Sequence, residues 1–183
     1  AGVGGAGTSS AKLNFAIHHS QLYVSGIFLN MRLGKWNGSS WLPVYNESNY
    51  CKSIISYHDT LLVTDGSKIW CLKNGDLVSS WIPNFPSNDG GKMAVLNDTL
   101  FAIGGSSKVY WFNNFGAWIT TASASGSFNN DNILSLESCE IGLFTGGAMT
   151  KINGEYAVGV SKWNDAAWDS ITMFSFPDGD VNA

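Results

Sequence analysis

The sequence has little charge and few basic side chains. Only 13% of its 183 residues are charged, the formal net charge is −4, and Arg32 is the only arginine. Such a chain cannot neutralise many phosphates, which excludes a large nucleic-acid footprint and a basic membrane-surface anchor. No apolar run approaches the roughly 20 residues that cross a bilayer. We therefore expect no nucleic-acid partner and no membrane insertion.

Cysteine is also scarce. Cys51, Cys71 and Cys139 are an odd set without CxxC spacing, which is not the pattern of a disulfide framework. For Cys51 and Cys71 we expect buried free thiols, with a bond between the two as the open alternative. The chain begins with Ala1 rather than Met, which we interpret as a processed product or an excised domain.

Glycine and aromatic side chains are abundant instead. The chain contains 21 Gly, 8 Trp, 10 Phe and 6 Tyr, and with so few charges this favours short strands joined by tight turns over a helical bundle. A glycine follows an apolar run four times, at positions 26, 66, 105 and 147, in steps of 40, 39 and 42 residues. This period indicates four copies of one supersecondary unit.

Each copy contains four short apolar segments separated by turn residues such as Asn37-Gly38. A four-stranded meander cannot bury both of its faces, but stacking several meanders around an axis does so. We therefore predict an all-β fold, a β-propeller of four four-stranded blades, with part of a larger propeller as the alternative. The predicted blades span residues 13–46, 52–83, 92–122 and 133–174, between a flexible Gly/Ser-rich segment at 1–12 and a C-terminal tail at 175–183. Within the fourth blade, we place residues 148–156 in a loop.

Three segments carry a repeat pattern that resembles a known family. Residues 22–41 read LYVSGIFLNMRLGKWNGSSW, residues 146–168 read GGAMTKINGEYAVGVSKWNDAAW, and residues 101–105 read FAIGG. They resemble kelch-like propeller repeats of the WDGSSW type, which occur in bacterial surface, fungal cortical, and phage or giant-virus proteins. The resemblance covers about residues 13–174 and implies a propeller. It implies no single activity, because propellers host enzymes, lectins and scaffolds alike.

No set of reactive side chains converges in the sequence. Adjacent histidines on a strand point to opposite faces, so we interpret His18, His19 and His58 as turn-edge residues rather than metal ligands. Residues 178–182 (DGDVN) begin like a calcium loop but lack its distal Glu, and we interpret them as a solvated tail. G-x-S-x-G does not occur. We expect no catalytic residue, no metal site and no cofactor, and hence no enzyme.

The predicted loops between blades place polar and aromatic residues next to each other. Amides and carboxylates can bond the hydroxyl groups of a sugar or the polar groups of a peptide, while a neighbouring ring stacks on the ligand. The candidate ligand-binding residues are Asn49, Tyr50, Asn88, Asp89, Asn130 and Asp131.

These features together predict a non-catalytic surface module. It would bind a receptor, another protein or a glycan through its loop face, or form a structural part of a larger assembly, such as a phage particle, beside neighbouring subunits. We expect an extracellular or virion-surface location. The alternatives are a small propeller hydrolase or lyase, and an intracellular kelch-type interaction domain.

Overall fold

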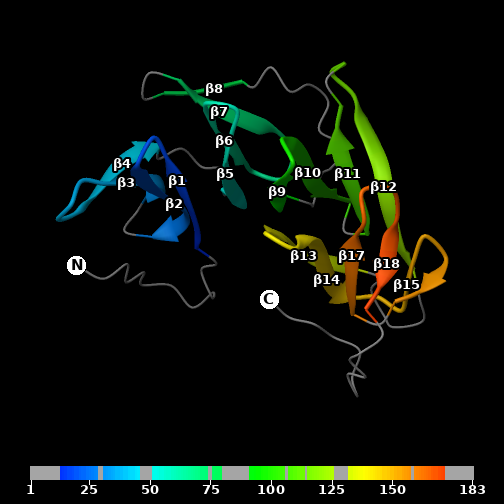
Figure 1. Ribbon diagram of the computed structural model, residues 1–183. Helices are drawn as coiled ribbons and strands as arrows, with labels where there is room; N and C mark the ends of the chain where they lie inside the picture. Colours follow the sequence, from blue (N-terminus) through cyan, green and yellow to red (C-terminus); the bar gives the residue numbers. More distant parts are fainter. Residues whose placement is uncertain are drawn as a thin grey trace. The chain divides into compact units, whose positions relative to one another are not determined.

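The protein is built from β-strands, as the computed structural model in Figure 1 shows. The structure describes residues 13–28, 31–45, 51–73, 76–79, 91–105, 107–113, 115–125, 132–157 and 159–171. Within these ranges it contains four antiparallel sheets and no helix, which confirms the all-β prediction. In the same ranges there is accordingly no helix that could cross a membrane.

The sheets follow one another along the chain. Sheet 1 comprises β1 (Asn14–His18), β2 (Gln21–Phe28), β3 (Met31–Trp36) and β4 (Trp41–Tyr45). Sheet 2 comprises β5 (Ser53–Tyr57), β6 (Thr60–Thr64), β7 (Ile69–Lys73) and β8 (Asp76–Ser79). Sheet 3 comprises β9 (Met93–Leu96), β10 (Thr99–Gly104), β11 (Lys108–Phe112) and β12 (Trp118–Ser125), extended by β15 (Lys151–Ile152) and β16 (Glu155–Tyr156). Sheet 4 comprises β13 (Asn132–Cys139), β14 (Gly142–Ala148), β17 (Val160–Trp163) and β18 (Trp168–Ser170).

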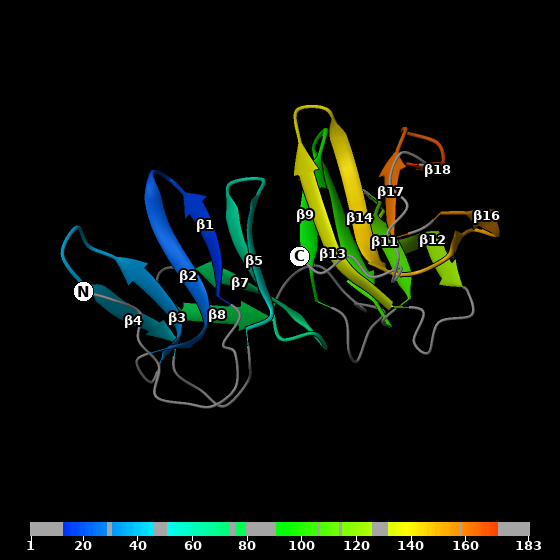
Figure 2. The same ribbon diagram turned by 90° about the horizontal axis from the view of Figure 1, so that it is seen from below.

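The chain divides into two compact units, Ala1–Pro83 and Asn84–Ala183. In unit 1, sheets 1 and 2 share a core that includes Tyr23, Leu33, Ile54, Leu61 and Val63. In unit 2, sheets 3 and 4 share a larger core that includes Phe101, Val109, Leu136, Leu143 and Trp168. Figure 2 shows the first strands of the paired sheets side by side, β1 with β5 in unit 1 and β9 with β13 in unit 2. Each unit is therefore a pair of meanders packed face to face.

The first hairpin of three sheets closes through a two-residue turn in the left-handed region. The turns are His19-Ser20, His58-Asp59 and Asn97-Asp98, with φ from 24° to 61°. Two successive residues with positive φ give the turn a twist that matches that of the flanking strands. Sheet 4 differs, because its turn is Glu140-Ile141 and Gly142 follows at φ 135°. Glycine suits this position because residues with a side chain rarely adopt φ 135°.

An asparagine side chain closes one hairpin in each of three sheets: β3–β4 in sheet 1, β11–β12 in sheet 3 and β17–β18 in sheet 4. Asn37 Oδ1 accepts hydrogen bonds from the backbone N–H groups two and three residues further on, at 3.0 and 2.8 Å. Asn164 does the same at 3.1 and 2.8 Å, and Asn113 bonds the N–H groups two and four residues further on, at 3.1 and 2.8 Å. Asparagine is preferred in such turns for this reason. An aromatic pair flanks each turn: Trp36 and Trp41 (centroids 5.2 Å apart), Trp163 and Trp168 (5.5 Å), and Phe112 and Trp118 (5.3 Å).

One hairpin lies where the sequence analysis predicted a loop. Residues 148–156, which we placed in a loop, contain β15 and β16, and β15 pairs with the end of β12 in sheet 3. Thr121 is the extra residue of a bulge in β12. Asn153 spans this bulge, because its Nδ2 donates to Thr121 O and its Oδ1 accepts from Ser123 N, both at 2.8 Å. A segment between two strands of sheet 4 is thereby hydrogen-bonded to sheet 3.

Candidate recognition surface

The six predicted ligand-binding residues lie outside the described residues. They are Asn49, Tyr50, Asn88, Asp89, Asn130 and Asp131. The loop-face site therefore stays a prediction. Within the described residues, functional side chains gather in two other places, which are the hairpin tips of unit 1 and the outer face of sheet 1.

The hairpin tips of sheets 1 and 2 are joined by histidine side chains. His18 Nδ1 lies 2.9 Å from Ser56 Oγ, and His19 Nε2 bonds Asp59 Oδ1. The rings of His18 and His19 stack with centroids 4.0 Å apart. Our expectation that the adjacent histidines point to opposite faces is wrong, because only His18 belongs to a strand, whereas His19 is a turn residue with φ 48°. Their position at a turn edge is as predicted.

The histidine cluster does not form a catalytic relay. A Ser-His-Asp relay needs one histidine between the hydroxyl and the carboxylate, but Ser56 and Asp59 bond different histidines. Burial lowers the pKa of His18, the charge of His19 lowers it further, and Asp59 opposes both. The hydrogen bond from His19 lowers the pKa of Asp59. These shifts favour a neutral His18 and an ionised Asp59, so the cluster serves as a polar link between two hairpins.

Metal ligands and reactive thiols do not gather in the part of the chain that the structure describes. No group of three or more His, Cys, Asp or Glu side chains there could hold a metal ion. All three cysteines are free, with Cys51 and Cys71 buried as expected and Cys139 exposed. Burial raises the pKa of Cys51 to about 11. Its thiol is therefore protonated at neutral pH and is not a nucleophile.

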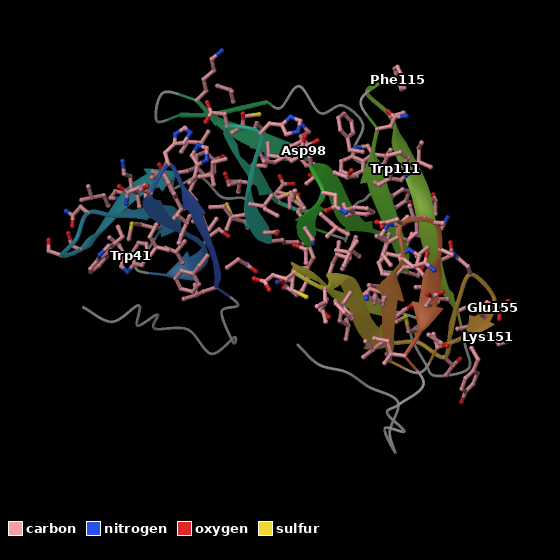
Figure 3. The ribbon with its side chains drawn as sticks, in the orientation of Figure 1. Trp41, Asp98, Trp111, Phe115, Lys151 and Glu155 are labelled. Carbon is pink, nitrogen blue, oxygen red and sulfur yellow. The ribbon has the colours of Figure 1, made fainter. Side chains whose placement is uncertain are left out.

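The outer face of sheet 1, which points away from sheet 2, is apolar and partly exposed to solvent. Val24 and Met31 are buried there against Leu13 and Trp41. Phe15 and Ile17 on β1 expose 53% and 70% of their surface. The ring of Phe15 lies 6.3 Å from that of Trp41, which is labelled in Figure 3. Trp41 in turn packs against Trp36. We call this surface the sheet 1 aromatic face and define it by Phe15, Ile17, Leu22, Trp36 and Trp41.

The alternation of side chains along β1 produces this face. Phe15 and Ile17 point outward because side chains on a strand alternate, while Ala16 between them packs against the core shared with sheet 2. Phe15 lies in register with Val24, and Val24 with Gly34. Because Gly34 has no side chain, the aromatic rings can lie over this row. The alternating apolar residues at 15 and 17 are the sequence signal of this face, whereas the predicted site residues lie in loops.

The outer face of sheet 4 has the opposite character. Four residues lie in one cross-strand row on it: Glu137, Phe144, Lys162 and Asp169. Lys162 Nζ lies 5.8 Å from the ring centroid of Phe144, as in a cation–π contact. Lys162 and Asp169 are directly opposite each other on neighbouring strands, and side chains of opposite charge in this position stabilise a sheet face in water. This face is therefore suited to solvent, whereas the sheet 1 aromatic face is suited to a partner.

Other large apolar side chains are exposed at hairpins of unit 2. Phe115 is 96% exposed at the tip of the β11–β12 hairpin, and Tyr156 is 65% exposed on the β15–β16 hairpin, where Figure 3 labels Lys151 and Glu155. Isolated exposed apolar residues are normal on protein surfaces, while contiguous patches mark interaction sites. The sheet 1 aromatic face is such a patch.

Comparisons with known proteins give a fold likeness without a family. No protein-family model and no curated protein matches the sequence. Two crystal structures of the extracellular domain of a B. thetaiotaomicron protein, described as a hybrid two-component and as a one-component system, are similar to this chain. Their TM-scores are 0.64 and 0.67 at 13% and 12% identity, covering 88% and 94% of this chain. The chain spans only 21% and 23% of their length. Glutaminyl cyclase of Myxococcus xanthus has a TM-score of 0.49 at 13% identity, covering 75% of this chain and 68% of that one.

Proposed function

We propose that this chain is a non-catalytic, propeller-type module that acts by docking as a structural part of a larger extracellular assembly. The observation that carries this function is the sheet 1 aromatic face. Phe15 and Ile17 are exposed beside Trp41 on the outer face of sheet 1. Keeping such side chains in water costs free energy that a partner surface recovers.

A propeller arrangement is supported by the order of the sheets. Four meanders follow one another along the chain, each unit packs two of them face to face, and the first strands of each pair lie together. Radial repetition uses these features to leave only short sheet edges. The extracellular location is supported by the fold likeness to an extracellular domain.

The composition of the face favours a protein partner over a sugar. A carbohydrate site combines stacking rings with convergent hydrogen-bonding groups. Here Ile17 and Leu22 form a cross-strand pair beside the tryptophans, and aliphatic side chains pack best against other apolar side chains. Docking of a protein surface therefore uses the whole face.

The proposed function is tested by blocking the face. The double substitution Phe15→Ser with Ile17→Lys changes two exposed side chains, so the fold should be retained, as circular dichroism checks. The wild-type chain should bind the dye ANS, which reports exposed apolar surface, and the double variant should lose most of this signal. Phe115→Ser is the matched control, because Phe115 is an exposed aromatic residue in the other unit, and it should keep the signal. Equal dye binding by wild type and double variant would contradict the proposal.

A further inference from the structure

A leucine recurs at one position in all four sheets. It is the second residue of each second strand: Leu22, Leu61, Leu100 and Leu143. The next residue points to the other face, because side chains alternate along a strand. These next residues are Tyr23, Leu62, Phe101 and Phe144. Each sheet thus has two faces. The leucine face contains the recurring leucine, and the opposite face contains the residue that follows this leucine.

In unit 1, the opposite face of sheet 1 packs on the leucine face of sheet 2. Tyr23 of sheet 1 shares one core with Leu61 and Val63 of sheet 2. Leu61 and Val63 are two residues apart on β6 and therefore lie on the same face. The contact is asymmetric, since sheet 1 contributes its opposite face and sheet 2 contributes its leucine face.

Unit 2 repeats this asymmetry. Phe101 on the opposite face of sheet 3 shares a core with Leu143 and Trp168 of sheet 4. Trp163 lies in register with both Leu143 and Trp168, so all three belong to the leucine face. The ring of Trp163 meets that of Phe101 edge to face, with centroids 6.1 Å apart. In both units, a sheet receives the next sheet in the chain on its opposite face.

When the four sheets are followed in chain order, the leucine face of sheet 1 comes first and the opposite face of sheet 4 comes last, and these two faces differ in charge. The first is the leucine face of sheet 1, which is the sheet 1 aromatic face. The last is the opposite face of sheet 4, with the row Glu137, Phe144, Lys162 and Asp169. The corresponding row of sheet 3 is Ala94, Phe101, Trp111 and Ile119. The central Phe is thus kept, while charged residues replace its three apolar neighbours.

We propose that the sheet 1 aromatic face docks the opposite face of a further sheet of this same repeat, a proposal that rests on the proposed function. The partner is a four-stranded antiparallel sheet with an aromatic residue third in its second strand and no carboxylate beside it in register, as in the docked row of sheet 1, which is Ala16, Tyr23, Lys35 and Leu42. The packing of Trp163 on Phe101 is the template, with Trp36 and Trp41 in the place of Trp163 and Trp168. This extends an interface already present twice in the protein.

The charged row excludes sheet 4 of a second wild-type copy as this partner. Docking there would take the carboxylates of Glu137 and Asp169 out of water, and burying such charges costs several kcal/mol per ion unless each is well paired. Lys162 does not distinguish sheet 4, because Lys35 holds the same place in the docked row of sheet 1. A row like that of sheet 3 carries no such cost. The partner is therefore distinguished from sheet 4 by the absence of these carboxylates.

A donor and an acceptor chain test the proposal. The donor carries Glu137→Ala, Lys162→Trp and Asp169→Ile, which give sheet 4 the row of sheet 3. It also carries Phe15→Ser and Ile17→Lys, so that its own aromatic face is blocked. The acceptor is the wild-type chain. Sedimentation velocity of the mixture should show a one-to-one complex, and acrylamide quenching of acceptor tryptophan should decrease.

The controls isolate the two surfaces. An acceptor with Phe15→Ser and Ile17→Lys, or a donor without the sheet 4 substitutions, should associate at least about tenfold more weakly, the change that about 1.4 kcal/mol gives. If circular dichroism shows that the donor does not fold, a donor that keeps Lys162 and carries only Glu137→Ala and Asp169→Ile replaces it.

The other outcomes overturn the inference. Absence of donor–acceptor association in a chain that still binds ANS would refute the repeat-sheet partner and leave the proposed docking function intact. Loss of both signals would refute both. A wild-type dimer that the acceptor block dissociates would assign the face to a second copy of the chain. Glycan-array binding that the same block removes would assign it to carbohydrate.

Discussion

The last hairpins of sheets 1 and 4 have almost the same sequence and different surroundings. Residues 35–41 read KWNGSSW and residues 162–168 read KWNDAAW. Both turns are closed by an asparagine and both tryptophan pairs are tilted at similar distances, 5.2 and 5.5 Å. Yet Trp168 is only 4% exposed in a core, while Trp41 lies half-buried on an open face. The hairpin is thus a local property, whereas the burial of its rings depends on the neighbouring sheet.

The largest expected difference between the two hairpins is in the cost of removing a tryptophan. Trp168→Ala should destabilise unit 2 by about 3–5 kcal/mol, because it leaves a cavity in a packed core. Trp41→Ala should cost only about 1–2 kcal/mol, since its ring is half-buried. Urea unfolding of the two variants measures both values. Equal costs would show that a partner surface already covers Trp41.

The asparagine turns should behave alike. Asn37→Ala and Asn164→Ala each remove two hydrogen bonds to backbone N–H groups, and each should cost about 1 kcal/mol. The substitution Asn37→Asp keeps the acceptor oxygen and serves as a control that should retain most of the stability. Asn164→Asp does not serve in this way, because Asn164 Nδ2 also donates to Asp169 Oδ2 at 2.8 Å and a carboxylate there would face Asp169. The free energies of unfolding of the two Ala variants are measured in the same denaturant series. If the losses differ by clearly more than the experimental error, the turn is coupled to the neighbouring sheet.

The smallest expected difference is in the response to acid. His18, His19 and His58 all lie in unit 1. The pKa of His18 is lowered from its ordinary value of 6.5, so the folded hairpin binds fewer protons than the unfolded chain below that pH, and unit 1 loses stability there. Asp59, whose pKa lies below its ordinary 3.8, adds a second loss as the pH falls further. Unit 2 contains no histidine, so it does not show the loss of stability that protonation of His18 causes in unit 1.

Hydrogen exchange distinguishes the two units. The protection factors of the β1–β2 hairpin should decrease between about pH 7 and about pH 5, the range in which histidine titrates. Those of the β9–β10 hairpin should stay constant. His18→Asn should remove the decrease, while His58→Asn should leave it in place. A decrease of the same size in both hairpins would locate the acid sensitivity elsewhere.

The sequence predicted strands and turns better than faces. Apolar alternation and residues that tolerate positive φ, such as Asn97 and Asp98, are local signals, and the four meanders could be read from them. The β15–β16 hairpin was missed because its partner is β12, an element about 28 residues earlier in the chain. The aromatic face was missed for a related reason. Alternation shows that Phe15 and Ile17 share a side, but only the packing of sheet 2 on the other side shows which side stays open.

The hydrogen bonds between β15 and β12 bear on how unit 2 resists mechanical load. Sheets 1 and 2 hold together through apolar side chains and through side-chain hydrogen bonds such as those of Asn14 and His18. In unit 2, β12 is bonded to β11 along one edge and to β15 along the other. Asn153 adds three more bonds to β12. Pulling sheet 4 away from sheet 3 works against the main-chain bonds between β12 and β15, so unit 2 should resist separation of its sheets more strongly than unit 1.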